Sequence, residues 1–185
     1  MDIFRKPKEN IAHWLLKRRQ KKVARSRTVH NFDNARKVGV IFSLDDTESF
    51  DLTNEFLNFL VKKEIRTYAL GYCPQKEIPS RVAPNSKINL FTKKDLNWYY
   101  MPIHPIVQQF ITEDFDILID LSKQSLLPLK FVNNLSTAKF KVGRDSNNGR
   151  NYDLMIKISE DQDLRFLIEQ IKHYLSRINK NQSYG

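Results

Sequence analysis

Short apolar runs alternate with amphipathic segments along most of the chain. Runs rich in β-branched and aromatic residues predict strands at 37–43, 67–72, 88–91, 115–121, 139–143 and 152–158. Apolar positions at helical spacing predict helices at 50–61, 105–112, 126–135 and 161–178. Strands separated by helices imply right-handed crossovers. We therefore expect an α/β fold, a three-layer Rossmann-like arrangement around a mostly parallel sheet of about five to six strands.

The first 36 residues follow a different pattern. The stretch from Lys8 to Arg27 has no Gly or Pro and is rich in helix-favouring residues, and Pro7 suits a helix entrance. We expect a helix over about residues 8–26 that begins with a small apolar patch (Ile11, Trp14, Leu15 and Leu16) and continues into a basic run. The chain thus divides into a basic N-terminal helical arm, residues 1–36, and a Rossmann-like domain, residues 37–185.

Charge is concentrated in this arm. The 185 residues hold 31 Lys and Arg against 21 Asp and Glu, a formal charge of +10. Residues 1–37 contain twelve bases and three acids, a net +9, which leaves +1 for the remaining chain. Because the rest of the chain is almost neutral, the positive charge of the arm does not serve general solubility. It indicates that the arm interacts with a polyanion.

Length and cysteine content exclude several classes of protein. The chain fits one α/β domain plus an appendage, and no run of about 18 apolar residues or secretory signal is visible. Cys73 is the single cysteine, so we expect a reducing, cytoplasmic setting. A nucleophilic pair of Cys73 with His104 and an ordinary buried or loop thiol are the alternatives for this residue.

The turn after the first predicted strand lacks a glycine-rich phosphate loop. It reads Leu44-Asp-Asp-Thr-Glu48, and Asp46 or Thr47 is suited to cap the next helix. An alternative is that Asp45, Asp46 and Asp120 converge at neighbouring strand ends and hold Mg²⁺. The sequence otherwise predicts no metal site, no cofactor and no catalytic set, so we lean against an enzyme.

Three adjacent aromatic residues precede two nearby prolines, Pro102 and Pro105. Trp98, Tyr99 and Tyr100, flanked by Lys93 and Lys94, could stack on unpaired bases beside cations. Three consecutive rings cannot all point one way, so we expect at least one to pack into the core.

Two motifs resemble a known class of enzyme. The segment Phe115-Asp-Ile-Leu-Ile-Asp-Leu-Ser122, a leucine-rich helix and Ala138-Lys-Phe-Lys-Val-Gly-Arg144 together resemble the N-terminal, acceptor-side half of heptosyltransferase-type glycosyltransferases. The resemblance covers roughly residues 37–178, and the donor-binding domain of that class has no counterpart here. It implies a Rossmann-like half-fold without the donor site. With its basic helix, the chain also looks like a short uncharacterised bacterial family, which implies no activity.

The basic arm gives the leading functional hypothesis. We expect a non-enzymatic RNA-binding or ribosome-associated protein whose phosphate contacts come from Lys17, Arg18, Arg19, Lys21, Lys22, Arg25 and Arg27. One alternative is a peripheral protein in which Phe4 and the apolar patch insert shallowly into a membrane while the bases contact anionic lipid. The other is a degenerate glycosyltransferase-like half-domain that acts with a protein partner.

Overall fold

The computed structural model describes residues 5–80, 82, 88–145, 152–159 and 162–178. Its elements, in chain order, are α1 (Arg5–Gln20), β1 (Lys37–Ser43), α2 (Thr47–Lys62), β2 (Arg66–Cys73), β3 (Ile88–Thr92), the 3-10 helix η1 (Lys93–Asp95), α3 (Pro105–Thr112), β4 (Ile117–Asp120), α4 (Leu127–Leu135), β5 (Phe140–Arg144), β6 (Leu154–Ile156) and α5 (Leu164–Leu175). The sequence also predicts a polar turn at 144–150, most of which lies outside the described residues.

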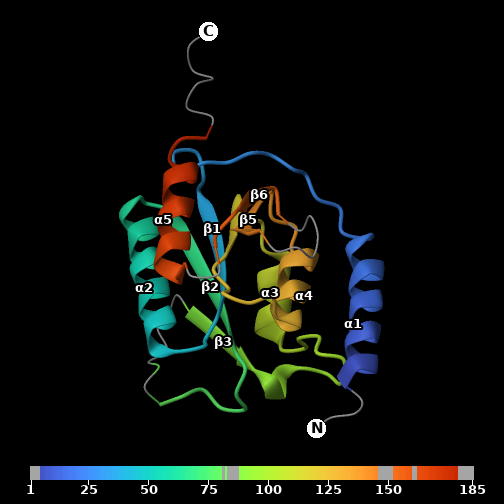
Figure 1. Ribbon diagram of the computed structural model, residues 1–185. Helices are drawn as coiled ribbons and strands as arrows, with labels where there is room; N and C mark the ends of the chain where they lie inside the picture. The colour runs from blue at the N-terminus through green and yellow to red at the C-terminus, as the bar shows by residue number, and fades with distance from the viewer. Residues whose placement is uncertain (1–4, 81, 83–87, 146–151, 160–161, 179–185) are drawn as a thin grey trace.

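Six strands form one sheet in the order β3-β2-β1-β4-β5-β6, and every described pair is parallel. The chain builds outward from β1 in one direction through β2 and β3, and then crosses over to β4 and continues the other way (Figure 1). The strand order therefore reverses between β1 and β4. This arrangement confirms the expected Rossmann-like α/β fold and places a topological switch point at the carboxyl ends of β1 and β4.

Helices cover both faces of the sheet. Side chains such as Ile117 and Ile119 on β4 join the core beneath α2 and α5. Leu118, between them, joins the core beneath α3 and α4, as the alternation of side chains along a strand requires. Both faces of β4 are thus buried, which explains why its sequence is a continuous apolar run.

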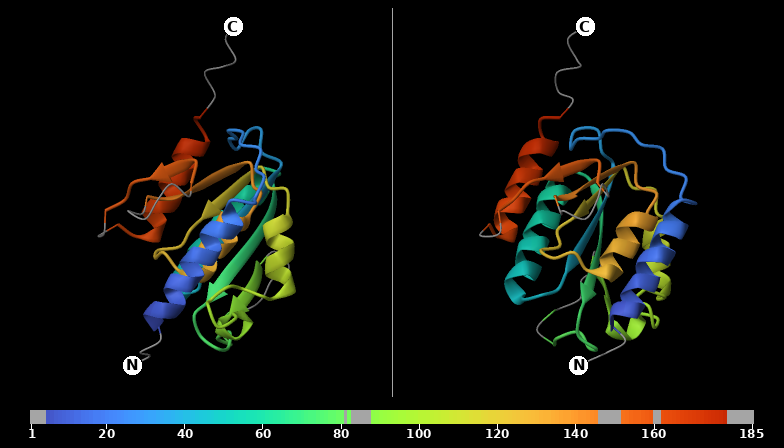
Figure 2. Two further views of the ribbon diagram at one scale, coloured as in Figure 1. Left: turned by 90° about the vertical axis from the view of Figure 1, so that its right-hand side faces the viewer. Right: turned by 45° about the vertical axis from the view of Figure 1, so that its right-hand side comes forward.

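Helix α1 adds an outer layer on one side of the molecule. It lies along α4, and its Ala12 and Leu16 are buried in a small cluster with Phe131 of α4 and Met101 (Figure 2). The segment that follows passes the amino ends of the strands on its way to β1 (Figure 1), and before β1 the Phe32 amide donates to the Leu175 carbonyl at 3.0 Å. The arm is therefore packed on the domain at both of its ends.

The arm helix is shorter at its carboxyl end than the sequence predicts. Helix is expected to about residue 26, but α1 ends at Gln20. Beyond it, Arg25 donates to the carbonyls of Ala138 and Lys139, and the Thr28 amide donates to Lys139 at 3.2 Å. These contacts with the start of β5 hold the segment in a non-helical path, so tertiary packing overrides local helix propensity.

Three elements in the second half of the chain are also shorter than predicted. Strand β4 covers four residues and β6 three, while α5 begins at Leu164 instead of 161. The α5 boundary has a clear cause, because the Asp163 side chain accepts a hydrogen bond from the Phe166 amide at 2.9 Å. Asp163 is therefore the N-cap that sets the start of this helix.

Candidate functional site

The outer face of α1, which we define as Trp14, Lys17, Arg18 and Lys21, combines an aromatic ring with three cations. These residues are spaced at i, i+3, i+4 and i+7, and they lie opposite the buried Ala12 and Leu16. Trp14 is 59% exposed, and the Arg18 guanidinium lies 5.5 Å from its ring centroid. A shallow depression of about 500 Å³ is lined by these four residues and Gln20. This face therefore offers positive charge beside a flat stacking surface.

Three other basic residues of the predicted set are held by the fold. Arg19 Nη1 lies 2.9 Å from the Met101 sulfur, beneath α1. Arg25 forms an ion pair with Asp153 in addition to its two carbonyl contacts. The Arg27 side chain is 74% exposed but its Nε lies 3.8 Å from Asp153. The structure thus separates Lys17, Arg18, Lys21 and the exposed Lys22 from bases that already have internal partners.

The aromatic triplet does not form a common stacking surface. Trp98 is 60% exposed, whereas Tyr99 is half-buried and packs with Met101 against the cluster beneath α1. The two rings meet edge to face at 5.0 Å, and Tyr100 takes a left-handed backbone conformation with φ of 64°. Only Trp98 presents most of its surface to solvent. As expected, at least one ring of the three packs inward.

The three acidic residues considered as magnesium ligands have separate roles. Strands β1 and β4 are neighbours, as that hypothesis required. However, Asp45 accepts from the Ser43 hydroxyl at 2.6 Å, and Asp46 caps α2 by accepting from the Ser49 amide at 2.7 Å. That capping bond lowers the pKa of Asp46. Within the described residues, no group of three acidic, His or Cys side chains is placed to hold a metal ion.

Cys73 and His104 also lie in different settings. Cys73 is buried, and its Sγ lies 3.7 Å from the Glu77 carbonyl. His104 is exposed at the start of α3, where its ring accepts from the Ile106 amide. These contacts fit the buried thiol that was the alternative for Cys73, and they make His104 the N-cap of α3.

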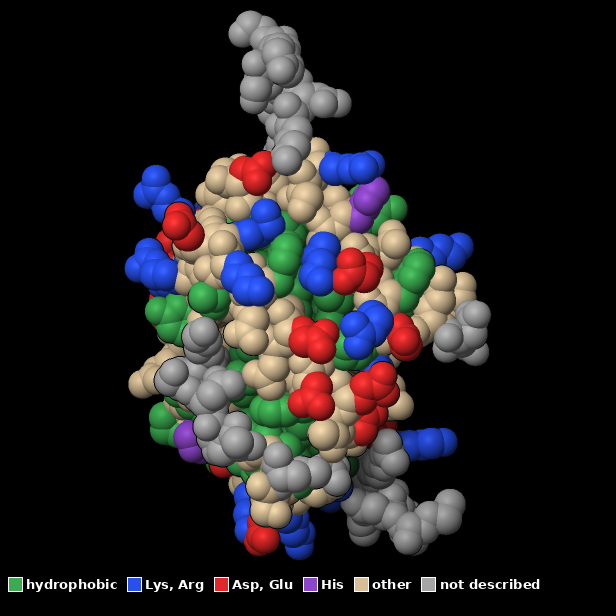
Figure 3. Space-filling view, turned by 90° about the vertical axis from the view of Figure 1, so that its left-hand side faces the viewer, with side chains coloured by type: hydrophobic (Ala, Val, Ile, Leu, Met, Phe, Trp, Pro, Cys, Tyr) green, Lys and Arg blue, Asp and Glu red, His purple; other side chains and the backbone are tan. Residues whose placement is uncertain are grey.

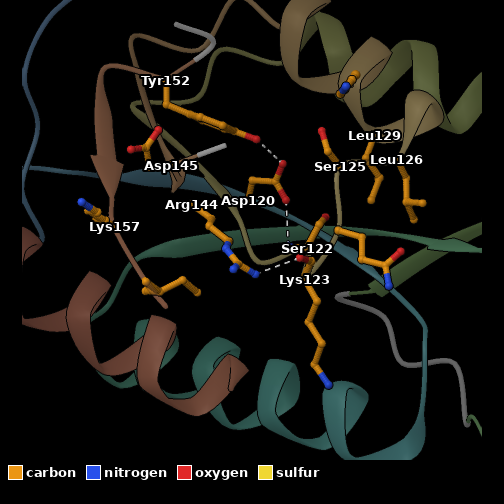
Figure 4. A pocket seen from close by; sticks show the side chains of 13 residues that line it. Asp120, Ser122, Lys123, Ser125, Leu126, Leu129, Arg144, Asp145, Tyr152 and Lys157 are labelled. Carbon is orange, nitrogen blue, oxygen red and sulfur yellow. Dashed lines mark hydrogen bonds between the residues drawn. The ribbon is translucent and has the colours of Figure 1, made fainter. Parts of the chain in front are cut away.

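A cavity of about 510 Å³ opens at the carboxyl ends of β4, β5 and β6, beside the switch point. We call it the switch-point cavity. Its lining is mostly polar and comes from the loop before α4, from the end of β5 and from residues around β6 (Figure 4). The lining residues are Asp120, Ser122, Lys123, Gln124, Ser125, Leu126, Leu129, Lys130, Arg144, Asp145, Tyr152, Lys157 and Ile158. This is where ligands bind in many open α/β sheets.

Asp120 and Tyr152 form the floor of the cavity. The Tyr152 hydroxyl donates to Asp120 at 2.6 Å, and the Ser122 amide donates to the other carboxylate oxygen at 2.8 Å (Figure 4). Burial raises the pKa of Asp120 above its ordinary value, while the bonds from Ser122 and Tyr152 act against that shift. Burial and the nearby Asp120 charge also raise the pKa of Tyr152. The pair therefore orders the loop after β4.

Gly143 makes this geometry feasible. The Tyr152 ring lies against the backbone of β5, and a Cβ atom on Gly143 would lie 2.6 Å from the ring carbon Cε1. No side chain fits between the two, so glycine allows the close approach that brings the hydroxyl to Asp120. Asp120 and Gly143 belong to recognisable sequence motifs, but the contribution of Tyr152 was not predictable because it lies 32 positions from Asp120.

A buried lysine, Lys141, lies two residues before Gly143 in β5. Lys141 lines a second cavity of about 510 Å³ beneath the segment that follows α1, together with Arg25 and Asp153. Its Nζ donates to the carbonyl of Asn133, in the last turn of α4. Burial, reinforced by Arg25, lowers the pKa of Lys141 to about 7. The sequence does not single out this residue, because one lysine in an apolar strand forms no pattern.

These features define a Rossmann-like α/β protein with a parallel six-stranded sheet, a polar cavity beside its switch point and a basic helix on an outer face. A family model matches residues 8–178, and the chain belongs to that family, which is described as a family of unknown function (DUF6913). No curated protein and no solved structure shows a significant match. Within the described residues, no helix is long and apolar enough to cross a membrane.

Proposed function

We propose that the protein binds RNA, free or in the ribosome, through the outer face of α1 and without catalysing a reaction. The observation that carries this proposal is the placement of Lys17, Arg18 and Lys21 beside the exposed ring of Trp14. The opposite side of the helix is anchored on α4 through Ala12 and Leu16. The backbone that carries the cations is therefore ordered before binding, so little backbone order has to be gained when RNA binds.

The distribution of charge over the molecule supports the same surface. The face formed by α2 and α5 carries acidic and basic side chains interspersed with one another (Figure 3). Several of them pair, as Arg165 does with Glu55 at 3.6 Å and Lys172 with Glu169 at 2.8 Å. The opposite charges of such pairs cancel over a short distance, whereas the charged side chains in the last turn of α1 are all basic. A polyanion would thus be drawn to α1 in preference to the α2 and α5 face.

RNA would make two kinds of contact with this face. Lys17, Lys21 and the neighbouring Lys22 would neutralise phosphates and release counterions, which gives affinity without reading the sequence. Trp14 offers a flat ring on which an unpaired base could stack, and Arg18, which lies near that ring, would neutralise the phosphate next to the stacked base. Arg25 would contribute little to RNA binding, because its guanidinium already bonds with Asp153 and with two backbone carbonyls.

Affinity purification of the full-length protein from cells tests this proposal, with and without nuclease treatment. A triple variant, Lys17→Gln, Arg18→Gln and Lys21→Gln, should lose RNA and RNA-containing particles that the native protein recovers. The matched control changes two exposed lysines and one exposed arginine elsewhere to Gln, at Lys62, Lys76 and Arg177, and removes the same charge. Equal recovery of RNA by both triple variants would refute the proposal.

The same purification, combined with a liposome assay, separates two other functions. Ile11 and Trp14 are both exposed, so flotation with anionic liposomes would indicate a membrane surface. However, Leu16, one of the residues expected to insert, is buried against α4, and Phe4 lies outside the residues that the structure describes. A protein partner that remains bound after nuclease treatment would instead favour a glycosyltransferase-like half-domain that acts with a second chain.

A further inference from the structure

The switch-point cavity carries several groups that favour a bound anion. The part of its lining that the structure describes contains four basic side chains and two acidic ones. One of the bases, Lys123, pairs with Asp46 at 3.3 Å, and one of the acids, Asp120, already receives two hydrogen bonds from the protein. Arg144 approaches from the end of β5 and donates to the Lys123 carbonyl at 3.1 Å (Figure 4). Lys157 lines the cavity from beyond β6. Positive charge thus reaches the cavity from three separate parts of the chain.

Helix α4 begins at the same cavity. Its N-cap residue, Leu126, has no side chain that can accept a hydrogen bond, and both Leu126 and Leu129 line the cavity. The first amides of a helix lack partners within the helix and carry partial positive charge. In α4 the Leu126 amide donates to Gln124 and Pro128 has no N–H, so Leu127 and Leu129 supply the amides of the first turn. An anion in the cavity could accept hydrogen bonds from this end of α4.

Ser122 provides a second, independent indication of a ligand. The residue is 9% exposed, and its buried Oγ, in the lining of the cavity, makes no well-formed hydrogen bond to a described residue. The hydroxyl lies close enough to the Asp120 carboxylate to help lower the pKa of that group, but its geometry there is poor. Buried hydroxyl groups without a partner are rare, because losing contact with water without compensation costs free energy. A ligand oxygen in the cavity would supply the missing partner.

From these groups we infer that the switch-point cavity binds the phosphate group of a small phosphorylated molecule. Ser122 and the start of α4 would donate to the phosphate oxygens, and Arg144 would compensate their charge. The cavity of about 510 Å³ is of the size that holds small-molecule ligands, so space remains beside the phosphate. Asp145, also in the lining, could accept from a hydroxyl group of the organic part. This site is separate from the outer face of α1 and is independent of the RNA proposal.

Titrations of the full-length protein monitored by backbone amide NMR test this inference. The probes are inorganic phosphate and ribose 5-phosphate, with ribose and sulfate as comparison ligands. Both phosphates should shift the amides of Ser122, Lys123 and Leu127. Tighter binding of ribose 5-phosphate assigns the site to an esterified phosphate, and equal binding would overturn the assignment to a phosphorylated molecule in favour of the free ion.

Two variants identify the groups that bind. Ser122→Ala should weaken phosphate binding about fivefold, and Arg144→Gln about tenfold, since hydrogen bonds to an ion are among the stronger ones. The control for the first is Ser49→Ala, which removes another buried hydroxyl without a partner, on α2 and away from the lining. The control for the second is Arg177→Gln, at an exposed position beyond α5.

Thermal unfolding keeps the test specific to binding. Because the Ser122 hydroxyl makes no well-formed hydrogen bond to a described residue, Ser122→Ala should retain the native unfolding temperature while it loses affinity. The inference is overturned if phosphate at tens of millimolar shifts no amide of the cavity. Such concentrations are far above those at which specific ligands typically bind. It is equally overturned if sulfate binds as well as phosphate and neither Ser122→Ala nor Arg144→Gln weakens binding.

Discussion

Replacing Lys141 with Met should remove a dependence of stability on pH. Lys141 is 3% exposed, and its Nζ donates to Asn133 at the carboxyl end of α4, where a cation is favourable. Burial nonetheless dominates and lowers the pKa of Lys141 to about 7 from its ordinary value of 10.5. Among its charged neighbours, Arg25 and Arg27 add to this shift and Asp153 opposes it.

The sign and size of the effect follow from these two values. Below pH 7 the lysine is charged in both the folded and unfolded states, so burying it costs the full amount. As the pH rises from 7 toward 10.5, Lys141 loses its proton in the folded state and keeps it in the unfolded state. The free energy of unfolding therefore increases over this range. Between pH 7 and pH 9 the native protein should gain about 2 kcal/mol in its free energy of unfolding from this residue.

Urea denaturation at pH 7, 8 and 9 measures this gain. Lys141→Met removes the buried amine at similar length, so the variant should show no such gain. The control, Lys62→Met at an exposed position, should follow the native protein. If Lys141→Met and the native protein gain equally between pH 7 and pH 9, the reasoning about burial is wrong.

Three substitutions test the packing around the sites by their free energy of unfolding in urea. Gly143→Ala should cost about 1–3 kcal/mol because its Cβ would overlap the Tyr152 ring. Tyr152→Phe should cost about 1–3 kcal/mol at pH 7, since the buried Asp120 carboxylate loses a donor, and less at pH 4, where the raised pKa favours its protonated form. Asp46→Ala should cost about 1 kcal/mol through loss of the α2 cap, whereas Asp46→Asn should cost little.

Each of these substitutions has an outcome that contradicts its argument. Native stability of Gly143→Ala would mean that the Tyr152 ring does not rest on β5. If Tyr152→Phe loses the same free energy of unfolding at both values of pH, the Tyr152 hydroxyl does not stabilise the ionised Asp120 carboxylate. If Asp46→Asn is as unstable as Asp46→Ala, the capping bond is not what stabilises the start of α2.

The architecture was predictable because buried parallel strands and amphipathic helices have strong periodic patterns. Strand β1 and helix α3 have the bounds that the sequence predicts, and the pattern of crossovers led to the correct sheet class. The end of α1 was not predictable in this way. Helix propensity favours residues up to about 26, and only the fold shows that Arg25 reaches carbonyls more than a hundred positions away.

The candidate sites were only partly accessible from the sequence, for the same reason. The basic composition of α1 is evident, but which cations face outward depends on the contacts of Ala12 and Leu16 with α4. The switch-point cavity depends on Ser122, Arg144 and Tyr152, which come together through the sheet and not through any local motif. Polar residues at strand ends give a general indication of where a ligand binds, but not of which side chains meet there.

The dependence of RNA affinity on salt concentration is the most direct test of the proposed function. Binding of a single-stranded RNA to the full-length protein would be measured at several salt concentrations, for the native chain and for the Lys17, Arg18 and Lys21 triple variant. Removing one cation that neutralises a phosphate should reduce the slope of log affinity against log salt by about 0.7, so the triple variant should lose roughly 2 in slope. The Lys62, Lys76 and Arg177 control should keep the native slope. Identical slopes for all three proteins would contradict the assignment of RNA binding to the outer face of α1.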